Sequence, residues 1–434
     1  GGNVLRARLN ALLRQHRLGP HPLIRHFLDR LNFRGIIRDC LGAGSRQGLD
    51  HAEVLSVLVH NVLVSRGPMY RVGEWAQRLT PQALGLTAGQ IGQLNDDRLV
   101  RSLDRLVVPS ARNVFFRLAL RAIKDFALSH KRVHFDTTTV TLFGQYDTAR
   151  SEPTITHGHN KDHRPDLKQL VFGLDVTADG AVPLLHHVFS GNRTDDSVHI
   201  RNVDELRTLL GHDDFIYVAD SKLCTRVNLA HVAGHGGRFV TVLPRTHKED
   251  QVFRAGLRAG EPPVRWRIFH TIPNPRRQGD PPDVYATTTA GPKATAEGYR
   301  ILWVKSSQKA EVDRHAREEH LRKAEIELKD LAGKIGKRQL RTQRSVAQRV
   351  KDVLAAQQVS GFLDVRIAAY TELEHRHLRR GRPRPEDPVQ TIRREKLRLD
   401  VRRNQAALKA EARTDGVFPL VTNLKGRAKR EILE

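Results

Sequence analysis

The spacing of the apolar residues changes near residue 132, and this change limits the folds that the chain can adopt. Before it, apolar residues recur at helical spacing, as in 50–64, where the cap-type residue Asp50 opens an apolar run. After it, β-branched and aromatic residues gather in short runs separated by turns, which is typical of strands. The sequence therefore predicts a helical region over 1–131, followed by an α/β fold with a mixed sheet.

The elements expected after residue 132 alternate between strands and helices. The expected strands are 133–140, 170–177, 181–185, 215–220 and 239–243, and the expected helices are 196–210 and 228–233. The second and third strands form a hairpin around the turn 178–180. The strand at 215–220 is apolar almost throughout, which predicts that both of its faces are buried.

Residues 247–415 interrupt this pattern and form a largely helical insertion. Short strands such as 299–304 precede a long helix over 308–357, whose apolar residues have the three-and-four spacing of a heptad seam: Leu321, Ala324, Leu328, Leu331 and Ile335. After a loop around 379–385, a second helix over 389–412 is expected to pack on the first as an antiparallel hairpin. Dimerisation through the seam is the alternative. A strand at 417–423 then returns to the sheet, so the expected domains are 1–131, 132–246, 247–415 and 416–434.

The charge of the chain bears on its partner. Lys and Arg number 73 against 48 Asp and Glu, which gives a formal charge of +25. Such a surplus attracts polyanions, and nucleic acid is the commonest of them. Arginine enrichment through the base composition of the genome is the alternative explanation. The charge favours double-stranded DNA as the partner and a DNA-binding role for the basic region 1–131.

Membrane and disulfide classes of protein are disfavoured. No apolar run approaches the roughly 20 residues that a membrane-spanning helix needs. The two cysteines, Cys40 and Cys224, provide neither a disulfide framework nor a zinc framework. These features predict a cytoplasmic, nucleoid-associated protein with no membrane partner.

Two aspartates stand out because each interrupts or ends an apolar strand. Asp136 lies within the first expected strand and Asp220 ends the fourth. A buried carboxylate needs a partner that compensates its desolvation, and two adjacent carboxylates repel each other unless a cation lies between them. Mg²⁺ and Mn²⁺ prefer such oxygen ligands, and two of these ions can activate phosphodiester cleavage. The alternative is that either aspartate is a strand-end cap.

Two runs of residues near these aspartates carry a resemblance to a known family. One run, 157–169, leads into the second strand, and the other, 191–196, follows the third. Together with the spacing of Asp136 and Asp220, and with 94–98 and 415–418, they resemble the transposases of insertion sequence family 1634, within the insertion-sequence-4 superfamily. The resemblance covers most of the chain and is weakest over 247–410.

The resemblance implies an RNase H-like fold and a DDE transposase that cleaves DNA strands and transfers them. Asp136 and Asp220 match its first two catalytic carboxylates, which hold two Mg²⁺ or Mn²⁺ ions. The third is a Glu on the helix after the last strand, in a context of Tyr, Arg and Lys. Glu431 and Glu434 lie too early and lack that context, so the third catalytic Glu is expected beyond the end of this chain. The DNA complex is expected to hold a homodimer.

Five basic residues near the aspartates are expected to contact DNA phosphates: Lys161, Arg164, Lys168, Arg193 and Lys222. Solvated surface charges are the alternative explanation for them. Asp175 is the strongest competitor for a metal-ligand role. Two alternative functions remain, a catalytically inactive DNA-binding remnant of a transposase and an RNase H-fold nuclease without strand transfer.

The histidines permit two further hypotheses. His157, His159 and His163 are close in sequence and suggest zinc, but no cysteine completes a tetrahedral site. The adjacent pair His186 and His187 lies in an apolar strand, which favours packing over metal ligation.

Overall fold

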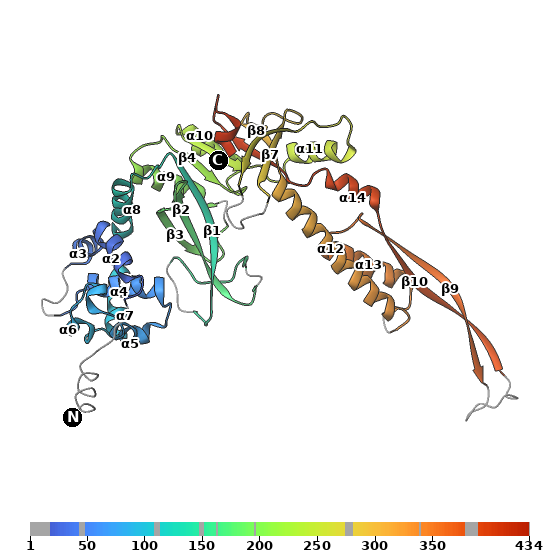
Figure 1. Cartoon of the computed structure of the whole chain (residues 1–434). Coiled ribbons are helices and arrows are strands. Elements are labelled where there is room, and N and C mark those ends of the chain that lie inside the picture. Colours follow the sequence, from blue (N-terminus) through green and yellow to red (C-terminus); the bar gives the residue numbers. More distant parts are fainter. Residues whose placement is uncertain are drawn as a thin grey trace, which may run out of the picture. The chain divides into compact units, whose positions relative to one another are not determined.

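The computed structural model describes residues 18–42, 48–107, 113–146, 152–161, 164–194, 197–273, 281–337, 340–377 and 389–433. The chain divides into two compact units, unit 1 up to Phe239 and unit 2 from Val240 onward. Figure 1 shows the helices and strands of both units, coloured along the chain. In these ranges, none of the helices is both long enough and apolar enough to cross a membrane.

Unit 1 begins with the helical region that the sequence predicts. Its helices are α2 (His21–Arg30), α3 (Phe33–Leu41), α4 (His51–Val64), α5 (Val72–Gln77), α6 (Ala88–Ile91), α7 (Asp96–Asp104) and α8 (Asn113–Asp125), with short 3-10 turns η1 (Met69–Arg71), η2 (Pro81–Leu84) and η3 (Arg105–Val107). The Asp50 cap of α4 is confirmed, because its carboxylate accepts a hydrogen bond from the Glu53 backbone N–H at 2.7 Å. Asn95 caps α7 in the same way.

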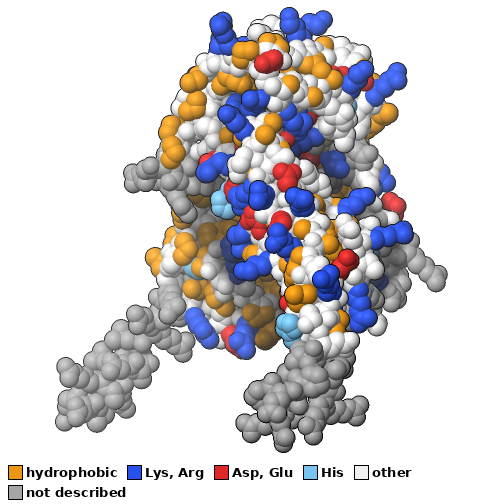
Figure 2. All heavy atoms as spheres, turned by 90° about the vertical axis from the view of Figure 1, so that its right-hand side faces the viewer, with side chains coloured by type: hydrophobic (Ala, Val, Ile, Leu, Met, Phe, Trp, Pro, Cys, Tyr) orange, Lys and Arg blue, Asp and Glu red, His pale blue; other side chains and the backbone are white. Residues whose placement is uncertain are grey.

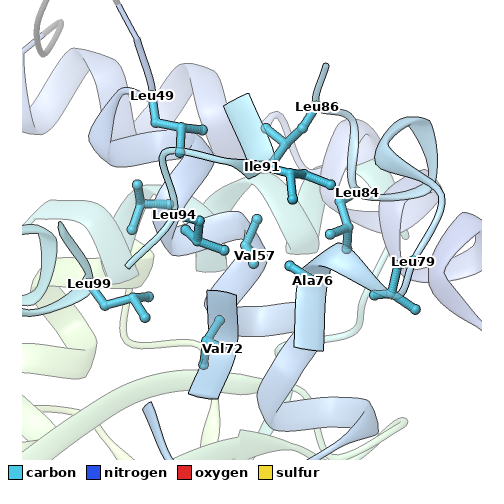
Figure 3. Close-up of a cluster of buried hydrophobic side chains, with 11 residues drawn as sticks. Leu49, Val57, Val72, Ala76, Leu79, Leu84, Leu86, Ile91, Leu94 and Leu99 are labelled. Atoms are coloured by element: carbon cyan, nitrogen blue, oxygen red, sulfur yellow. The ribbon is translucent and has the colours of Figure 1, made fainter. Parts of the chain in front are cut away.

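Helix α4 is apolar around most of its circumference because it packs into two separate cores. Val54 and Val57 belong to a cluster that extends to Leu99 on α7, shown in Figure 3. Ala52 and Leu55 belong to a second cluster with residues of α2, α3 and α8. Burial on two sides accounts for the apolar residues of the first part of α4, whereas Val62, Leu63 and Val64 at its end are exposed.

The strands of unit 1 follow the helical region in a mixed sheet, which confirms the predicted fold class. They are β1 (Arg132–Leu142), β2 (Lys168–Thr177), β3 (Pro183–Ser190), β4 (Ile216–Ala219) and β5 (Arg238–Val242), in the spatial order β3-β2-β1-β4-β5. β1 pairs antiparallel with β2 and parallel with β4, so the sheet is mixed around β1. Two helices of this part are α9 (His199–Leu210) and α10 (Arg226–Gly234). The expected start of the first of them, Asp196, lies outside the described residues.

Burial along β4 differs from the prediction for 215–220. Tyr217 and Ala219 are buried, whereas Ile216 and Val218 are only half-buried. The strand therefore has one covered face and one partly open face. The sequence did not reveal the open face, because its residue Val218 is apolar although it lines a surface hollow.

Unit 2 contains the remaining strands of the sheet. They are β6 (Arg267–Ile272), β7 (Asp283–Thr288), β8 (Arg300–Ser306) and β11 (Val417–Thr422), and with β5 they follow the order β5-β11-β8-β7-β6. β11 is antiparallel to its neighbours β5 and β8, which confirms that the strand near 417–423 returns to the sheet. Helix α11 (Lys248–Ala259) packs on β8 through Phe253, whose ring lies 4.1 Å from that of Trp303. A short helix, α15 (Lys429–Leu433), follows β11.

The predicted long helix over 308–357 is two helices, α12 (Ser307–Lys334) and α13 (Gln343–Ala356). The chain turns at Gly336, where φ is +85°, a backbone conformation that glycine adopts without steric cost. Leu321, Ala324 and Leu328 of the heptad seam are fully buried in a cluster with apolar residues of α13, and α13 folds back along α12 (Figure 1). The seam therefore serves packing within the chain.

The predicted second helix over 389–412 is wrong for most of its length. Strand β10 (Val389–Arg403) pairs antiparallel with β9 (Leu363–His377) as a two-stranded ribbon, and only α14 (Gln405–Ala412) is helical. Leu397, Leu399 and Val401 alternate with charged residues, which is the period of a strand with one face packed on α12 and α13. Segment 247–415 is therefore a mixture of helices and strands, and the loop expected around 379–385 lies outside the described residues.

Buried ion pairs secure the point at which the chain returns from α14 to β11. Asp415 forms a bidentate pair with Arg317 of α12, with both N–O distances at 2.7 Å. Asp313 accepts a hydrogen bond from the backbone N–H of Gly416. Gly416 has φ +75° and lies so close to the Ser306 carbonyl that a Cβ would be 2.3 Å from it. These contacts give the Asp415–Gly416 motif a structural role at the start of β11.

Candidate active site

The carboxylate of Asp136 lies on the open face of β1. Val133, Phe135 and Thr137 are buried on one face of the strand, and Asp136 is exposed on the other. This alternation follows from the two-residue period of a strand. The desolvation that we expected for a strand aspartate is therefore absent, and Asp136 is accessible to solvent and to ions.

Asp220 lies beside Asp136 because β1 and β4 are parallel and in register. Phe135 pairs with Ala219 across the two strands, and each aspartate is the next residue along its strand. Neighbouring strands lie about 4.8 Å apart. Both aspartates line one open hollow of about 540 Å³, together with residues of β1, β2 and β4. The structure thus brings together the two carboxylates that the sequence singled out.

Local hydrogen bonds orient both carboxylates. Oδ1 of Asp136 accepts from the Thr137 backbone N–H at 2.7 Å, and Oδ1 of Asp220 accepts from the Lys222 backbone N–H at 3.0 Å. The second bond forms part of the turn that leads from β4 toward α10. The cap-like bonds that we considered as an alternative are therefore present, and they leave Asp136 and Asp220 on the surface of the same hollow.

The rest of the hollow is largely apolar. It is lined by His134, Phe135, Thr137, Thr138, Phe172, Leu174, Val176, Val218 and Ala219. Burial lowers the pKa of His134, and the charge of Arg132 lowers it further, so this ring is neutral near pH 7. The two carboxylates are therefore the only acidic side chains among the described residues that line this hollow.

The oxygen ligands fit a hard divalent cation, but they do not form a complete site. In the part of the chain that the structure describes, no group of three or more His, Cys, Asp or Glu side chains is placed to hold a metal ion. Glu431, on the short helix α15, lies 3.3 Å from Arg427, and Glu434 is outside the described residues. The two aspartates are therefore a pair of candidate ligands without a described third.

Asp175 does not join this pair. It is opposite Phe135 in the β1–β2 register, so its side chain lies on the covered face, away from Asp136. It is fully buried, and Asn202 of α9 donates a hydrogen bond to its Oδ1 at 2.9 Å. Burial raises the pKa of Asp175 well above its usual value. The competitor for the metal-ligand role is thus a core residue.

The basic residues fall into two groups, those next to the aspartates and those further away. The Lys161 ammonium donates to the carbonyl oxygen of Thr137, the residue next to Asp136. Lys222 is exposed two residues beyond Asp220. The Lys168 ammonium donates to the Gln145 carbonyl. Lys161 and Lys222 are therefore the two predicted phosphate contacts that adjoin the aspartate pair.

Arg164 and Arg193 are placed differently. Arg164 is exposed and pairs with Asp166, with an N–O distance of 2.7 Å, so part of its charge is already matched. Arg193 is an exposed loop residue after β3. Figure 2 shows one face of the molecule, on which Lys and Arg side chains are spread over the surface with Asp and Glu among them. The positive charge of the chain is distributed over this face and is not confined to one site.

The two runs that carry the family resemblance meet in the structure. The side-chain amide of Gln169 donates to the Gly191 carbonyl at 2.7 Å, and the Gly191 N–H donates to the Thr154 carbonyl at 3.1 Å. A Cβ on Gly158 would lie 2.0 Å from the Gly191 carbonyl oxygen. Gly158, Gln169 and Gly191 are thus required for a close backbone crossing. The family resemblance singled out the two runs, but the sequence did not show that these three residues have a structural role.

The histidine hypotheses have different outcomes. His157 and His159 are exposed, and His163 lies outside the described residues. The packing interpretation of the other two is confirmed: His186 meets the ring of Phe115 at 4.5 Å, and His187 is buried against Phe189. The two cysteines, Cys40 and Cys224, are buried and free.

Comparison with known proteins gives a family model for the helical region and distant structural likenesses. A model described as "Domain of unknown function (DUF4277)" matches residues 14–120. No curated protein matches the chain.

Three solved structures that resemble the chain are complexes of transposases. A piggyBac transposase synaptic complex with hairpin DNA has a TM-score of 0.27 and 9% identity over 64% of this chain and 51% of its own. A Mos1 transposase paired-end complex has a TM-score of 0.18 and 10% identity, over 45% of this chain and 59% of its own. A pre-cleavage Mos1 transpososome gives nearly the same values, with 60% of its own chain covered. The chain therefore spans between one half and two thirds of each of these proteins, and the likenesses are too distant to assign a function.

Proposed function

We propose that the chain is a DDE transposase related to insertion sequence family 1634, with an RNase H-like core that cleaves and joins DNA strands. One observation carries the proposal. The parallel β1–β4 register places Asp136 and Asp220 side by side at the surface of one hollow. Adjacent exposed carboxylates on neighbouring strands repel each other, and a divalent cation bound between them offsets that repulsion.

Asp136 and Asp220 are the residues that would hold Mg²⁺ or Mn²⁺. Two such ions, when bound, supply an activated oxygen nucleophile and stabilise the leaving oxygen of a phosphodiester. The resemblance implies a third carboxylate for the proposed triad, a Glu on a helix after the last strand, and we assign it to no described residue.

Basic side chains would position the DNA backbone at the aspartates. Lys161 and Lys222 adjoin the pair, and their ammonium groups suit contacts with the phosphates on either side of the scissile bond. Lys168, Arg164 and Arg193 would contact phosphates further along the strand. Arg164 would have to exchange Asp166 for phosphate, so its net contribution to DNA affinity would be smaller. The assembly proposed on double-stranded DNA is a homodimer of a cytoplasmic protein.

The metal proposal is tested by Mn²⁺ binding, measured by calorimetric titration and by the electron paramagnetic resonance signal of free Mn²⁺. Asp136→Asn or Asp220→Asn should weaken binding at least 10-fold, because each removes one of two charged ligands. Asp166→Asn is the matched control, since Asp166 is an exposed carboxylate paired with Arg164 away from the strand pair. Equal affinity in all four proteins would contradict the metal assignment.

The DNA proposal is tested by the dependence of affinity on salt. The log–log slope should grow by about 0.9 for each phosphate contacted. Removing Lys161, Arg164 and Lys168 together should flatten that slope. A control that removes Lys329, Arg349 and Lys351, which are exposed on α12 and α13, changes the net charge equally. If both triple variants flatten the slope to the same extent, the binding is a general effect of charge and not a property of this site.

Catalysis is tested with Mg²⁺ and a DNA duplex that carries the element's ends, using a protein that includes the Glu-bearing helix implied by the resemblance. Nicking followed by joining supports the transposase. Nicking without joining supports the RNase H-fold nuclease, and DNA binding without nicking supports the inactive remnant. In the active case, Asp136→Asn and Asp220→Asn should each abolish nicking while leaving DNA affinity nearly unchanged, because phosphate contacts supply most of the binding.

A further inference from the structure

A group of polar side chains lies buried on the covered face of the strands that carry the two aspartates. Asp175 of β2, Asn202 of α9 and Tyr217 of β4 are all fully buried. The Nδ2 atom of Asn202 donates to Oδ1 of Asp175 at 2.9 Å and to the Tyr217 hydroxyl at 3.0 Å. One amide group thus connects β2 to β4, the two strands on either side of β1.

Two oxygen atoms in this group have no hydrogen-bond partner among the described residues. They are Oδ2 of Asp175 and Oδ1 of Asn202. An ionised carboxylate and an amide oxygen are both acceptors, so neither can satisfy the other. A proton on Asp175 Oδ2 changes this, because a carboxylic acid and an amide can pair through two parallel hydrogen bonds, one in each direction.

No cationic partner of Asp175 is found among the side chains that face it. α9 presents Asn202 and Glu205, β4 presents Tyr217, and β3 presents His187. β1 presents the apolar ring of Phe135. Burial lowers the pKa of His187, whose Nδ1 lies 3.7 Å from Glu205, so this ring is mainly neutral near pH 7. His199 of α9 contacts the Tyr217 hydroxyl, with its Nδ1 at 3.0 Å. A buried carboxylate in such surroundings is stable only in its neutral form.

We infer that Asp175 is a protonated, neutral carboxylic acid that pairs with Asn202, and that this pair acts with Tyr217 as a clamp fixing β2 and β4 on either side of β1. Asp175, Asn202 and Tyr217 are positioning residues in this assignment. Phe135 lies within the clamp, opposite Asp175 and 6.2 Å from the Tyr217 ring. Asp136 follows Phe135, and Asp220 lies three residues after Tyr217. The clamp therefore holds the backbone that sets the separation of the two carboxylates, a consequence that rests on the proposed function.

The proton on Asp175 is tested through the pH dependence of stability. Because the folded pKa of Asp175 is raised, the folded state holds a proton that the unfolded state releases above about pH 4. Wild-type stability therefore falls, relative to a permanently neutral residue, as pH rises through the folded pKa. The melting temperature of Asp175→Asn minus that of the wild type should increase between pH 5 and pH 8.

Asp179→Asn is the matched control, four residues away in the same hairpin. Asp179 accepts a hydrogen bond from the Ser129 backbone N–H at 2.9 Å, and this bond lowers its pKa. Its carboxylate is ionised in both folded and unfolded states above pH 5, so the corresponding difference should not change between pH 5 and pH 8. A difference for Asp175→Asn that is equally flat would overturn the assignment of the proton.

Infrared spectroscopy gives an independent measurement. The spectrum of the wild type at pH 7 should contain the carbonyl stretch of a carboxylic acid, which Asp175→Asn should lack and Asp179→Asn should retain. A wild-type spectrum with only carboxylate bands would overturn the proposal even if Asp175→Asn failed to fold.

The positioning role is tested by Mn²⁺ affinity. Asn202→Ala breaks both strand contacts and should weaken Mn²⁺ binding about 10-fold, the loss typical of residues that orient metal ligands. Asp175→Asn keeps a neutral partner for Asn202 and should bind Mn²⁺ as the wild type does. Unchanged affinity in a folded Asn202→Ala protein would contradict the positioning role. If the wild type binds no Mn²⁺, the proposed function fails while the pH and infrared results still decide the clamp.

Discussion

Two buried carboxylates of unit 2 and one buried carboxylate of unit 1 are stabilised in different ways. In unit 2, Asp415 and Asp250 are each paired with an arginine, Arg317 and Arg254 respectively. In unit 1, Asp175 is buried with an amide and a phenol as its neighbours. The difference teaches that burial alone does not fix the state of a carboxylate. A guanidinium matches the charge of a buried carboxylate, whereas burial with no cation beside it raises the pKa of Asp175 and favours the protonated acid.

The two arginines also link helices of unit 2 to the start of β11. Arg254 of α11 binds Asp250 and donates to the carbonyl oxygens of Thr414 and Val417, so one guanidinium joins a helix to the start of β11. Arg317 does the same from α12 through Asp415. The proposed clamp of unit 1 connects two strands through neutral side chains, without an ion pair.

Removing the cation from unit 2 should have the largest effect. Arg317→Met leaves Asp415 nearly buried without its partner, and such a loss costs about 3 kcal/mol. Urea unfolding followed by tryptophan fluorescence measures it, because Trp266 and Trp303 both lie in unit 2. The control is Arg314→Met, whose pair with Glu311 on the same helix is exposed and should contribute little. Similar losses in both variants would break the comparison, because burial would then make no difference to the pair.

A buried base should make unit 1 sensitive to acid. His60 is buried beside His21, with Nδ1 atoms 3.1 Å apart, and burial lowers the pKa of His60 to about 4. The unfolded state takes up a proton near pH 6.5 that the folded state does not bind. Stability is therefore present above pH 6.5 and is lost as the pH falls toward 4.

Calorimetric melting of the wild type between pH 7.5 and pH 4.5 should show this loss. His60→Gln removes the titrating group and should reduce the dependence on pH, whatever its own stability. His51→Gln is the control, since His51 is only partly buried at the start of α4. If His60→Gln and the wild type lose stability in parallel, the acid sensitivity originates elsewhere.

Removing one hydroxyl from the clamp should have a moderate effect. Tyr217→Phe deletes the acceptor of one Asn202 hydrogen bond and leaves a buried donor unpaired, which costs about 1–2 kcal/mol. Chemical denaturation with circular dichroism measures the change in unit 1. Tyr70→Phe serves as a control because Tyr70 is 65% exposed. A stability loss in Tyr70→Phe as large as that in Tyr217→Phe would refute the clamp as its source.

The smallest effect should come from an exposed pair. Asp166→Asn removes the partner of Arg164, and both side chains are about half-exposed. Surface pairs of this kind contribute little to stability. The melting temperature should remain within the error of the measurement, and DNA affinity should rise slightly because Arg164 is released. A clear loss of stability would mean that the loop 157–169 depends on this pair.

The sequence predicted the main helices and strands of unit 1. It also predicted that Asp136 and Asp220 lie close together, as they do in the structure. The alternation of residues in each strand, and the position of Asp136 and Asp220 in or after an apolar strand, are local patterns that a single sequence contains. The burial of Asp175 could not be predicted, because it depends on α9 packing against β2. Whether the two aspartates bind metal and the five basic residues bind DNA remains a prediction.

The errors in unit 2 have local causes. Over 389–412, residues with high helix propensity such as Arg, Lys, Glu and Leu concealed the alternation of Leu397, Leu399 and Val401. In 308–357 the heptad seam is real, but Gly336 allows the chain to reverse so that the seam packs on α13. The first error gave residue type more weight than period, and the second followed the period across a turn at Gly336.

The ribbon of β9 and β10 also defines a length. Each strand has fifteen residues, and at about 3.4 Å per residue each is roughly 50 Å long. A DNA duplex rises by about 3.4 Å per base pair, so the ribbon is as long as about fifteen base pairs. If the chain binds DNA as proposed, the length of the ribbon would limit the distance between its base on α12 and α13 and a DNA contact at its tip.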